Sequence, residues 1–132
     1  MKKVTYFAVF EPTKSGYSVF FPDLLGCITV GKSIDEAFTM AKEVLGLHLW
    51  GMERSNEKIP QPTQPPFADL EADTFIMPID VFPELVKNEI ESKAIKKTLT
   101  IPYWLNALAE EKKVNFSHIL QQGLKDYLQI TG

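Results

Sequence analysis

Three polar side chains alternate with two apolar ones near the C-terminus of this chain. Lys96, Thr98 and Thr100 would share one face of a short strand, and Leu99 and Ile101 would share the other. A threonine hydroxyl can donate or accept a hydrogen bond at a base edge, and a lysine can reach guanine or phosphate. Because a two-stranded ribbon fits the DNA major groove, this spacing predicts a strand that contacts bases. The same residue types also occur on ordinary exposed strand edges, so that alternative stays open.

A second group of residues is predicted to bind DNA phosphates. The helix expected over residues 117–128 begins at Ser117, whose hydroxyl is a favourable N-cap acceptor. Free amides at a helix N-terminus bind phosphate, so Ser117 and its neighbour His118 are expected to contact the DNA backbone. Lys97, a cation beside the residues expected to contact bases, is also expected to contact phosphate. The alternatives are a purely structural cap at Ser117 and an ordinary solvent-exposed histidine.

Residues 96–132 are expected to form one strand and two short helices, the first of which begins near Pro102. A piece of about 35 residues rarely folds alone without disulfides, metals or oligomerisation. We therefore predict that this module folds as a homodimer in which the two strands pair. A tetramer would follow if the N-terminal parts also self-associate.

The N-terminal part offers several carboxylates but no arrangement expected to catalyse a reaction. A hydrolytic metal site needs carboxylates that converge on the ions. Asp23 falls in a turn, while Asp35 and Glu36 open a helix, where acidic side chains are stabilised. Glu43 is the remaining candidate, and no acidic residues alternate along the expected strands. The sequence therefore predicts no catalytic residues, no metal, no cofactor and no enzymatic activity.

Cys27 is the single cysteine of the chain, and His48 is a candidate base on the helix that follows it. A nucleophilic cysteine needs a base or cation that lowers its pKa, whereas a buried thiol that packs as a small apolar side chain is more common. We expect the second situation here. One cysteine excludes an internal disulfide framework and fits a reducing cytoplasm. No apolar run approaches the ~20 residues of a membrane span, and no signal-peptide core follows the first residues.

Three strands and a helix are predicted in the first half of the chain. β-Branched and aromatic residues gather in strand-length runs between turn clusters. Ser33 and Glu36 have the spacing of a capping box, and apolar residues then recur at helical spacing as far as Met52. The predicted strands cover residues 4–10, 17–21 and 27–30, and the helix follows Ser33.

A proline-rich segment over residues 60–66 leads to a fourth predicted strand over 74–80, which Pro78 restricts to a sheet edge. The simplest packing of these elements is an α+β domain with a small antiparallel sheet and a helix on one face. The predicted domains are 1–80 and 96–132, joined by a linker or short helix over 81–95.

Charge is divided unevenly along the 132 residues, whose formal net charge is −3. Residues 93–132 hold six lysines against three acidic residues, which gives +3 and leaves −6 for residues 1–92. An acidic body with a basic tail suggests two different partners. The alternative is that any two pieces of a sequence differ by a few charges.

Residues 16–24 and 26–31, followed by Ser33, Glu36 and Ala37, resemble the motif of the HicB antitoxin family. That motif is G-Y-x-V-x-F-P-D-L-P-G-C-x-T-x-G, followed by T-x-x-E-A at the start of a helix. Leu25 departs from it, because the family usually has proline there. Residues 96–128 resemble the ribbon-helix-helix family of DNA-binding dimers, so the two resemblances together cover most of the chain.

The HicB resemblance implies a partial, degenerate ribonuclease H-like fold for the N-terminal domain. It implies an antitoxin of a type II toxin–antitoxin system that binds and neutralises HicA, a small basic toxin that cleaves mRNA. It also implies repression of the operon's own transcription, so the expected partners are a HicA-like toxin and operator DNA, with no membrane. The charge of −6 on residues 1–92 suits a basic partner, because opposite fields speed association. The toxin-binding residues stay unassigned.

Two other functions remain open from the sequence. One is a ligand-sensing transcriptional repressor without a toxin partner. The other is a toxin-binding protein whose C-terminal module only forms oligomers.

Overall fold

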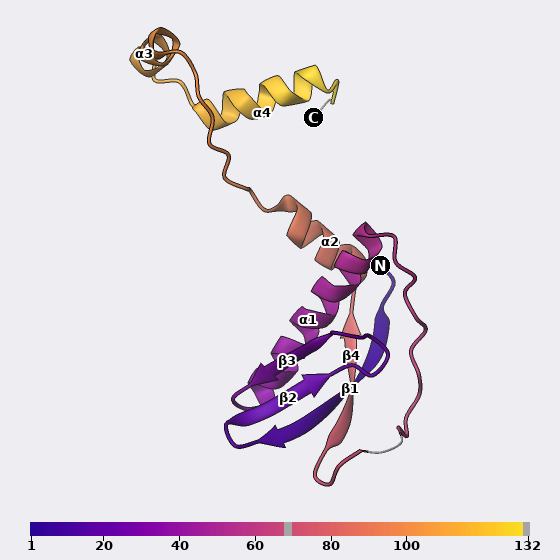
Figure 1. Ribbon diagram of the computed structural model, residues 1–132. Helices are drawn as coiled ribbons and strands as arrows, with labels where there is room; N and C mark the ends of the chain where they lie inside the picture. Colours follow the sequence, from indigo (N-terminus) through magenta and orange to yellow (C-terminus); the bar gives the residue numbers. More distant parts are fainter. Residues whose placement is uncertain (68–69, 131–132) are drawn as a thin grey trace. The chain divides into compact units, whose positions relative to one another are not determined.

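The computed structural model describes residues 1–67 and 70–130, and the chain divides into two compact units, Met1–Ala94 (unit 1) and Ile95–Gly132 (unit 2) (Figure 1). Unit 1 contains β1 (Val4–Thr13), β2 (Gly16–Phe20), β3 (Ile28–Gly31), α1 (Ile34–Arg54), β4 (Phe75–Val81) and α2 (Pro83–Ser92). Unit 2 contains α3 (Tyr103–Glu111) and α4 (Phe116–Tyr127).

The four strands of unit 1 form one sheet in the order β3-β2-β1-β4, and every neighbouring pair is antiparallel. Helix α1 lies along one face of this sheet (Figure 1). The predicted α+β architecture, an antiparallel sheet with a helix on one face, is confirmed. Pro78 lies in β4 at the edge of the sheet, where its missing N–H costs the least.

The core of unit 1 lies between α1 and the face of the sheet that α1 covers. Alternate residues of β1 point into it, because successive side chains of a strand face opposite sides. The helix contributes two alanines and two leucines at helical spacing, and the alanines let the helix approach the sheet closely. The buried residues that meet here include Tyr6, Ala8, Phe10, Val19, Cys27, Ala37, Ala41, Leu45, Leu49 and Ile79.

Two glycines of the motif are required by close backbone approaches. A Cβ at Gly31 would lie 2.4 Å from the backbone nitrogen of Ala37, so only glycine lets β3 pass directly into the start of α1. Gly16 has a φ of 147° and would place a Cβ 2.1 Å from the carbonyl oxygen of Gly31. The motif therefore specifies how the β1–β2 hairpin, β3 and the first turn of α1 fit together.

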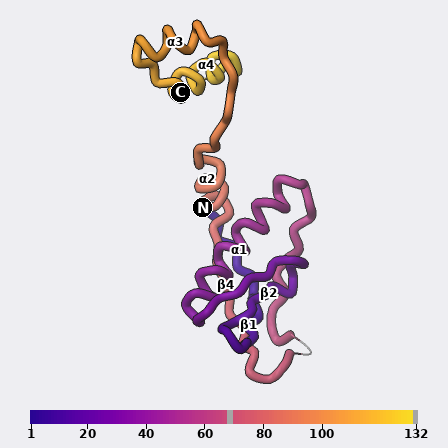
Figure 2. The backbone as a smooth tube through the Cα atoms, turned by 60° about the vertical axis from the view of Figure 1, so that its left-hand side comes forward, coloured from indigo at the N-terminus to yellow at the C-terminus, as the bar shows by residue number. Residues whose placement is uncertain are grey.

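The segment that follows α1 runs along unit 1 (Figure 2). Hydrogen bonds with residues that are distant in sequence hold it there. The Asp23 carboxylate accepts hydrogen bonds from the backbone N–H of Thr63 at 2.8 Å and from its hydroxyl at 2.6 Å. The Tyr6 hydroxyl donates to the carbonyl oxygen of Pro60. Burial, with a smaller effect from nearby Asp23, raises the pKa of Tyr6. These contacts give Asp23 a structural role.

Helix α2 belongs to unit 1, whereas the sequence places the boundary of the first domain at residue 80. Val86 of α2 packs against the core, and a Cβ at Gly46 would lie 3.0 Å from a Val86 methyl group, so Gly46 makes room for this helix. The Trp50 side chain adds a hydrogen bond from Nε1 to Glu91 Oε2 at 3.1 Å. The sequence of residues 83–92 does not reveal that this helix belongs to unit 1, because its packing depends on Gly46 in α1.

Candidate nucleic-acid interface

The segment predicted to contact bases is exposed and forms neither helix nor strand in the single chain. Lys96, Thr98 and Thr100 are all exposed, and so are the apolar side chains that alternate with them, Leu99 at 57% and Ile101 at 44%. A strand is defined by the hydrogen bonds to its neighbour, and the predicted neighbour is the same segment of a second copy. The paired ribbon therefore stays a prediction.

Unit 2 has two amphipathic helices but no core of its own. None of its described residues, 95–130, is buried. Apolar side chains that are exposed together on two helices and the segment before them are typical of a surface that a partner covers. The exposed large apolar residues are Ile95, Leu99, Ile101, Tyr103, Trp104, Leu105, Leu108, Phe116, Ile119, Leu120, Leu124, Tyr127, Leu128 and Ile130.

The N-terminus of α4 corrects one prediction from the sequence. Helix α4 begins at Phe116, and its N-cap is Asn115, whose Oδ1 accepts from the backbone N–H of His118 at 3.0 Å. Ser117 was expected to be the cap and instead lies in the first turn. Asparagine caps as well as serine does, so Asn115, two residues before Ser117, was an equally good candidate from its residue type alone.

The structure brings together only part of the predicted phosphate-binding group. Ser117 and His118 are neighbours in the first turn of α4, and both are exposed. Lys97 lies in the segment before α3, together with the three residues expected to contact bases. In the described part of unit 2, no hydrogen bond or ion pair joins these two groups. Their roles toward DNA stay predictions.

Replacing Asn115 with alanine should destabilise unit 2 by about 1 kcal/mol, because the N–H of His118 loses its acceptor. Ser117→Ala is the matched control, and its effect should stay within about 0.5 kcal/mol because Ser117 is not the cap. Urea denaturation followed by far-UV circular dichroism measures both. A larger loss in the serine variant than in the asparagine variant would contradict this assignment of the cap.

The Cys27 thiol and the first turn of α1, which were considered for chemistry, are explained by burial and by helix capping. Burial raises the pKa of the Cys27 thiol to about 11, so it stays protonated at neutral pH and is a weak nucleophile. Its Sγ faces the carbonyl oxygen of Val44 at 3.8 Å. Ser33 caps α1 by accepting from the N–H of Glu36 at 3.1 Å, as predicted. Within residues 1–67 and 70–130, no group of three or more His, Cys, Asp or Glu is placed to hold a metal ion.

Membrane insertion has no candidate segment among the described helices. None of them is both long enough and apolar enough to cross a bilayer.

Among curated proteins, the chain is similar to two relatives, and each match covers a short stretch of sequence. It is 37% identical over 51 residues to an uncharacterized 14.9 kDa protein in the rep-hol intergenic region of Haemophilus phage HP1, a match covering 39% of this chain and 38% of that protein. It is 44% identical over 46 residues to a UPF0150 protein of Helicobacter pylori, covering 35% of this chain and 64% of that protein. The chain thus spans less than two thirds of the length of either relative.

Solved structures match over nearly the whole chain. A chain of a toxin–antitoxin complex from Streptococcus pneumoniae is 30% identical with a TM-score of 0.58, and the match covers 96% of this chain and 99% of that one. The antitoxin HicB3 is 20% identical with a TM-score of 0.52, over 93% and 97% of the two chains, which shows a shared fold. The model of the HicB-like antitoxins of bacterial toxin–antitoxin systems matches residues 6–122, across both units. The chain therefore belongs to the HicB-like antitoxin family.

Proposed function

We propose that this protein is an antitoxin with two activities, one in each unit. Unit 1 binds and neutralises a small, basic, mRNA-cleaving toxin of the HicA type, and it is not itself an enzyme. Unit 2 forms a ribbon-helix-helix dimer that binds operator DNA and represses the protein's own operon. Both activities belong in the cytoplasm, where their RNA and DNA targets are. The observation that carries the proposal is that the family match extends across both units.

The proposal of a dimer rests on the missing core of unit 2. Its two helices and the preceding segment expose large apolar side chains along most of their length, and none is buried. A unit of about this size gains too little from its own contacts to offset its conformational entropy. A second copy of unit 2 offers the same apolar surface, and a two-fold interface pairs the same patch of the two copies.

DNA binding is supported by the polar residues on the face of the paired strands that would point away from the dimer interface. When the exposed apolar pair Leu99 and Ile101 turns toward the partner, Lys96, Thr98 and Thr100 face away from it. Two antiparallel copies of this strand would present six such side chains to the major groove. The net charge of +3 over residues 93–132 adds a sequence-independent attraction to phosphates.

Toxin binding is assigned to unit 1 because of its charge and its independent core. Unit 1 has a buried cluster of its own, so it can present a rigid surface whatever the state of unit 2. Residues 1–92 carry −6, which favours a basic partner. We infer that the sheet and helix are a degenerate form of a ribonuclease H-like fold that keeps the scaffold without the metal chemistry.

The alternative of a ligand-sensing repressor has weaker support from the geometry. An open hollow of about 490 Å³ lies beside the end of β3 and the start of α1. Val30, Lys32 and Glu36 on its lining are exposed, so a small molecule there would keep much of its surface in water. Ligand sites typically bury about 70–90% of the ligand.

The test of the proposal is co-expression with the small basic protein encoded beside the gene for this chain. We expect the two proteins to copurify and the toxin's cleavage of mRNA to be suppressed in the complex. The toxin alone, released by denaturation and refolded, is the control that should cleave. No complex, together with no cleavage of mRNA by the neighbouring protein purified alone, would overturn the antitoxin role and favour the ligand-sensing repressor.

A further inference from the structure

Unit 1 leaves one face of its sheet without a covering helix, and this surface, the open face, is largely apolar. We propose that the open face is where unit 1 binds its basic toxin. This inference rests on the proposed antitoxin function and names the surface that performs it.

The strand register fixes which residues share the open face. Tyr6, Ala8 and Phe10 point toward α1 and belong to the core, so the odd-numbered residues of β1 point the other way. Val9 is buried but lies outside the core cluster that includes α1, which agrees with this direction. The apolar residues that the pairings place on the open face are Phe7, Val9, Phe20, Ile28, Val30, Ile76 and Pro78.

Exposure increases across this face from its centre toward the β3 edge. Val9 is fully enclosed by its neighbours, and Phe7, Phe20 and Ile76 are half-buried. Ile28 and Val30 on β3 are 64% and 68% exposed. A sheet with one face in water normally alternates apolar and polar residues, so an apolar second face indicates a surface that is covered in use.

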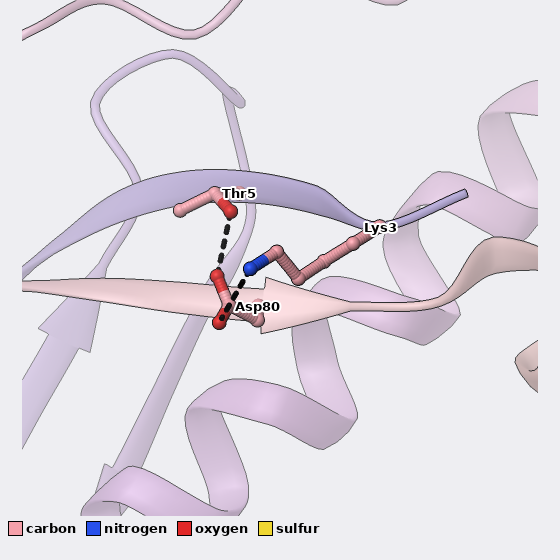
Figure 3. Close-up of polar contacts among 3 residues, drawn as sticks. All are labelled: Lys3, Thr5 and Asp80. Carbon is pink, nitrogen blue, oxygen red and sulfur yellow. Dashed lines mark hydrogen bonds and ion pairs between the residues drawn. The ribbon is translucent and has the colours of Figure 1, made fainter. Parts of the chain in front are cut away.

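Charged groups lie at the ends of the open face rather than at its centre. At one end, Asp80 Oδ1 accepts from the Thr5 hydroxyl at 2.6 Å, and Asp80 Oδ2 lies 3.8 Å from Lys3 Nζ (Figure 3). At the other end of β1, the register also places Glu11 on this face. Asp80 and Glu11 are the charged strand residues found there in the described part of the chain. Lys3 offsets the charge of Asp80 at the first end, so the acidic group that the face offers a partner beside its apolar centre is Glu11.

The sign of the charge distinguishes a basic toxin from a second copy of unit 1. Two copies would bring together two domains whose residues 1–92 each carry a net charge of −6, and this repulsion opposes their association. A small basic protein instead meets a complementary field and an apolar centre that can exclude water from the contact. Apolar burial and attraction between opposite charges then act together.

The test changes the most exposed apolar side chain of the open face in the full-length protein. Val30→Lys should weaken binding of the copurifying toxin by about 30-fold or more, because a positive charge replaces an apolar side chain at the exposed β3 edge of the face and repels a basic partner. Val30→Glu should weaken it less, since the new charge attracts the toxin. Calorimetric titration measures the dissociation constants, and thermal melting checks that each variant is folded. Should Val30→Lys fail to fold, Ile28→Lys makes the same test.

Leu47→Lys is the matched control, because Leu47 is 56% exposed but lies on α1, which covers the opposite side of the sheet. Its dissociation constant should stay within about threefold of the wild-type value. Unchanged affinity in both Val30 variants, with a wild-type complex present, would overturn this inference and leave the antitoxin function standing. No wild-type complex would instead overturn the proposed function itself.

Light scattering on the antitoxin alone completes the test. The Val30→Lys variant should form assemblies of the same mass as the wild type, because the proposal leaves the open face uncovered when no toxin is bound. If the wild type is a tetramer that Val30→Lys converts to a dimer, a second copy occupies the face, and the inference is overturned.

Discussion

Leu124→Asp in α4 should convert the protein from a dimer into a monomer that no longer binds its operator. Leu124 is 52% exposed in the single chain, and it lies on the apolar side of α4 that a second copy is expected to cover. An aspartate there would bury an uncompensated charge in the interface, at a cost of several kcal/mol. Light scattering should give the 15.0 kDa mass of one chain instead of twice that value.

The control for this variant is Gln122→Glu, which adds the same charge on the opposite side of α4. Gln122 donates to Asp126 Oδ1 at 3.0 Å, so the change replaces one hydrogen bond with a like-charge pair and should cost only a few tenths of a kcal/mol. Toxin binding should survive in both variants, because the core of unit 1 contains no residue of unit 2. A Leu124→Asp protein that remains dimeric would show that dimerisation does not depend on unit 2.

The triple replacement of Lys96, Thr98 and Thr100 with alanine should abolish sequence-specific DNA binding and leave the dimer intact. Each well-placed base contact is worth about 1–3 kcal/mol, and a dimer would present six of these side chains. Affinity for the protein's own promoter should therefore fall by at least about 100-fold, to the level of scrambled DNA. Gel retardation with both DNAs over a range of salt concentrations measures the loss.

Lys112→Ala with Lys113→Ala is the comparison for the triple variant, because it removes two positive charges from unit 2 outside the predicted strand. This pair should weaken binding to promoter and scrambled DNA alike, since phosphate contacts carry little sequence information. A triple variant that still prefers its promoter would exclude the predicted strand as the element that contacts bases. Unit 2 would then serve oligomerisation or a different mode of DNA binding.

The sequence by itself determined the four strands and the first helix of unit 1, and their order. Strand-length apolar runs between turn residues, the Ser33 cap and the proline in β4 all act locally, and the structure has the predicted sheet, helix and edge strand. The uneven charge and the alternation around Thr98 are also properties of the sequence alone. The family resemblance drawn from the glycine-rich motif was confirmed by the comparisons.

The tertiary structure decided what depends on contacts between residues distant in sequence. Helix α2 joins unit 1 because Gly46 leaves space for Val86, and Asp23 is structural because its carboxylate meets Thr63. The open face became visible only once the register showed which side of β1 faces α1, because Val9 and Phe10 are both buried and the sequence pattern does not separate them. Local patterns specify helices and strands through short-range sterics and hydrogen bonds, whereas the choice of which face is covered depends on packing across the whole unit.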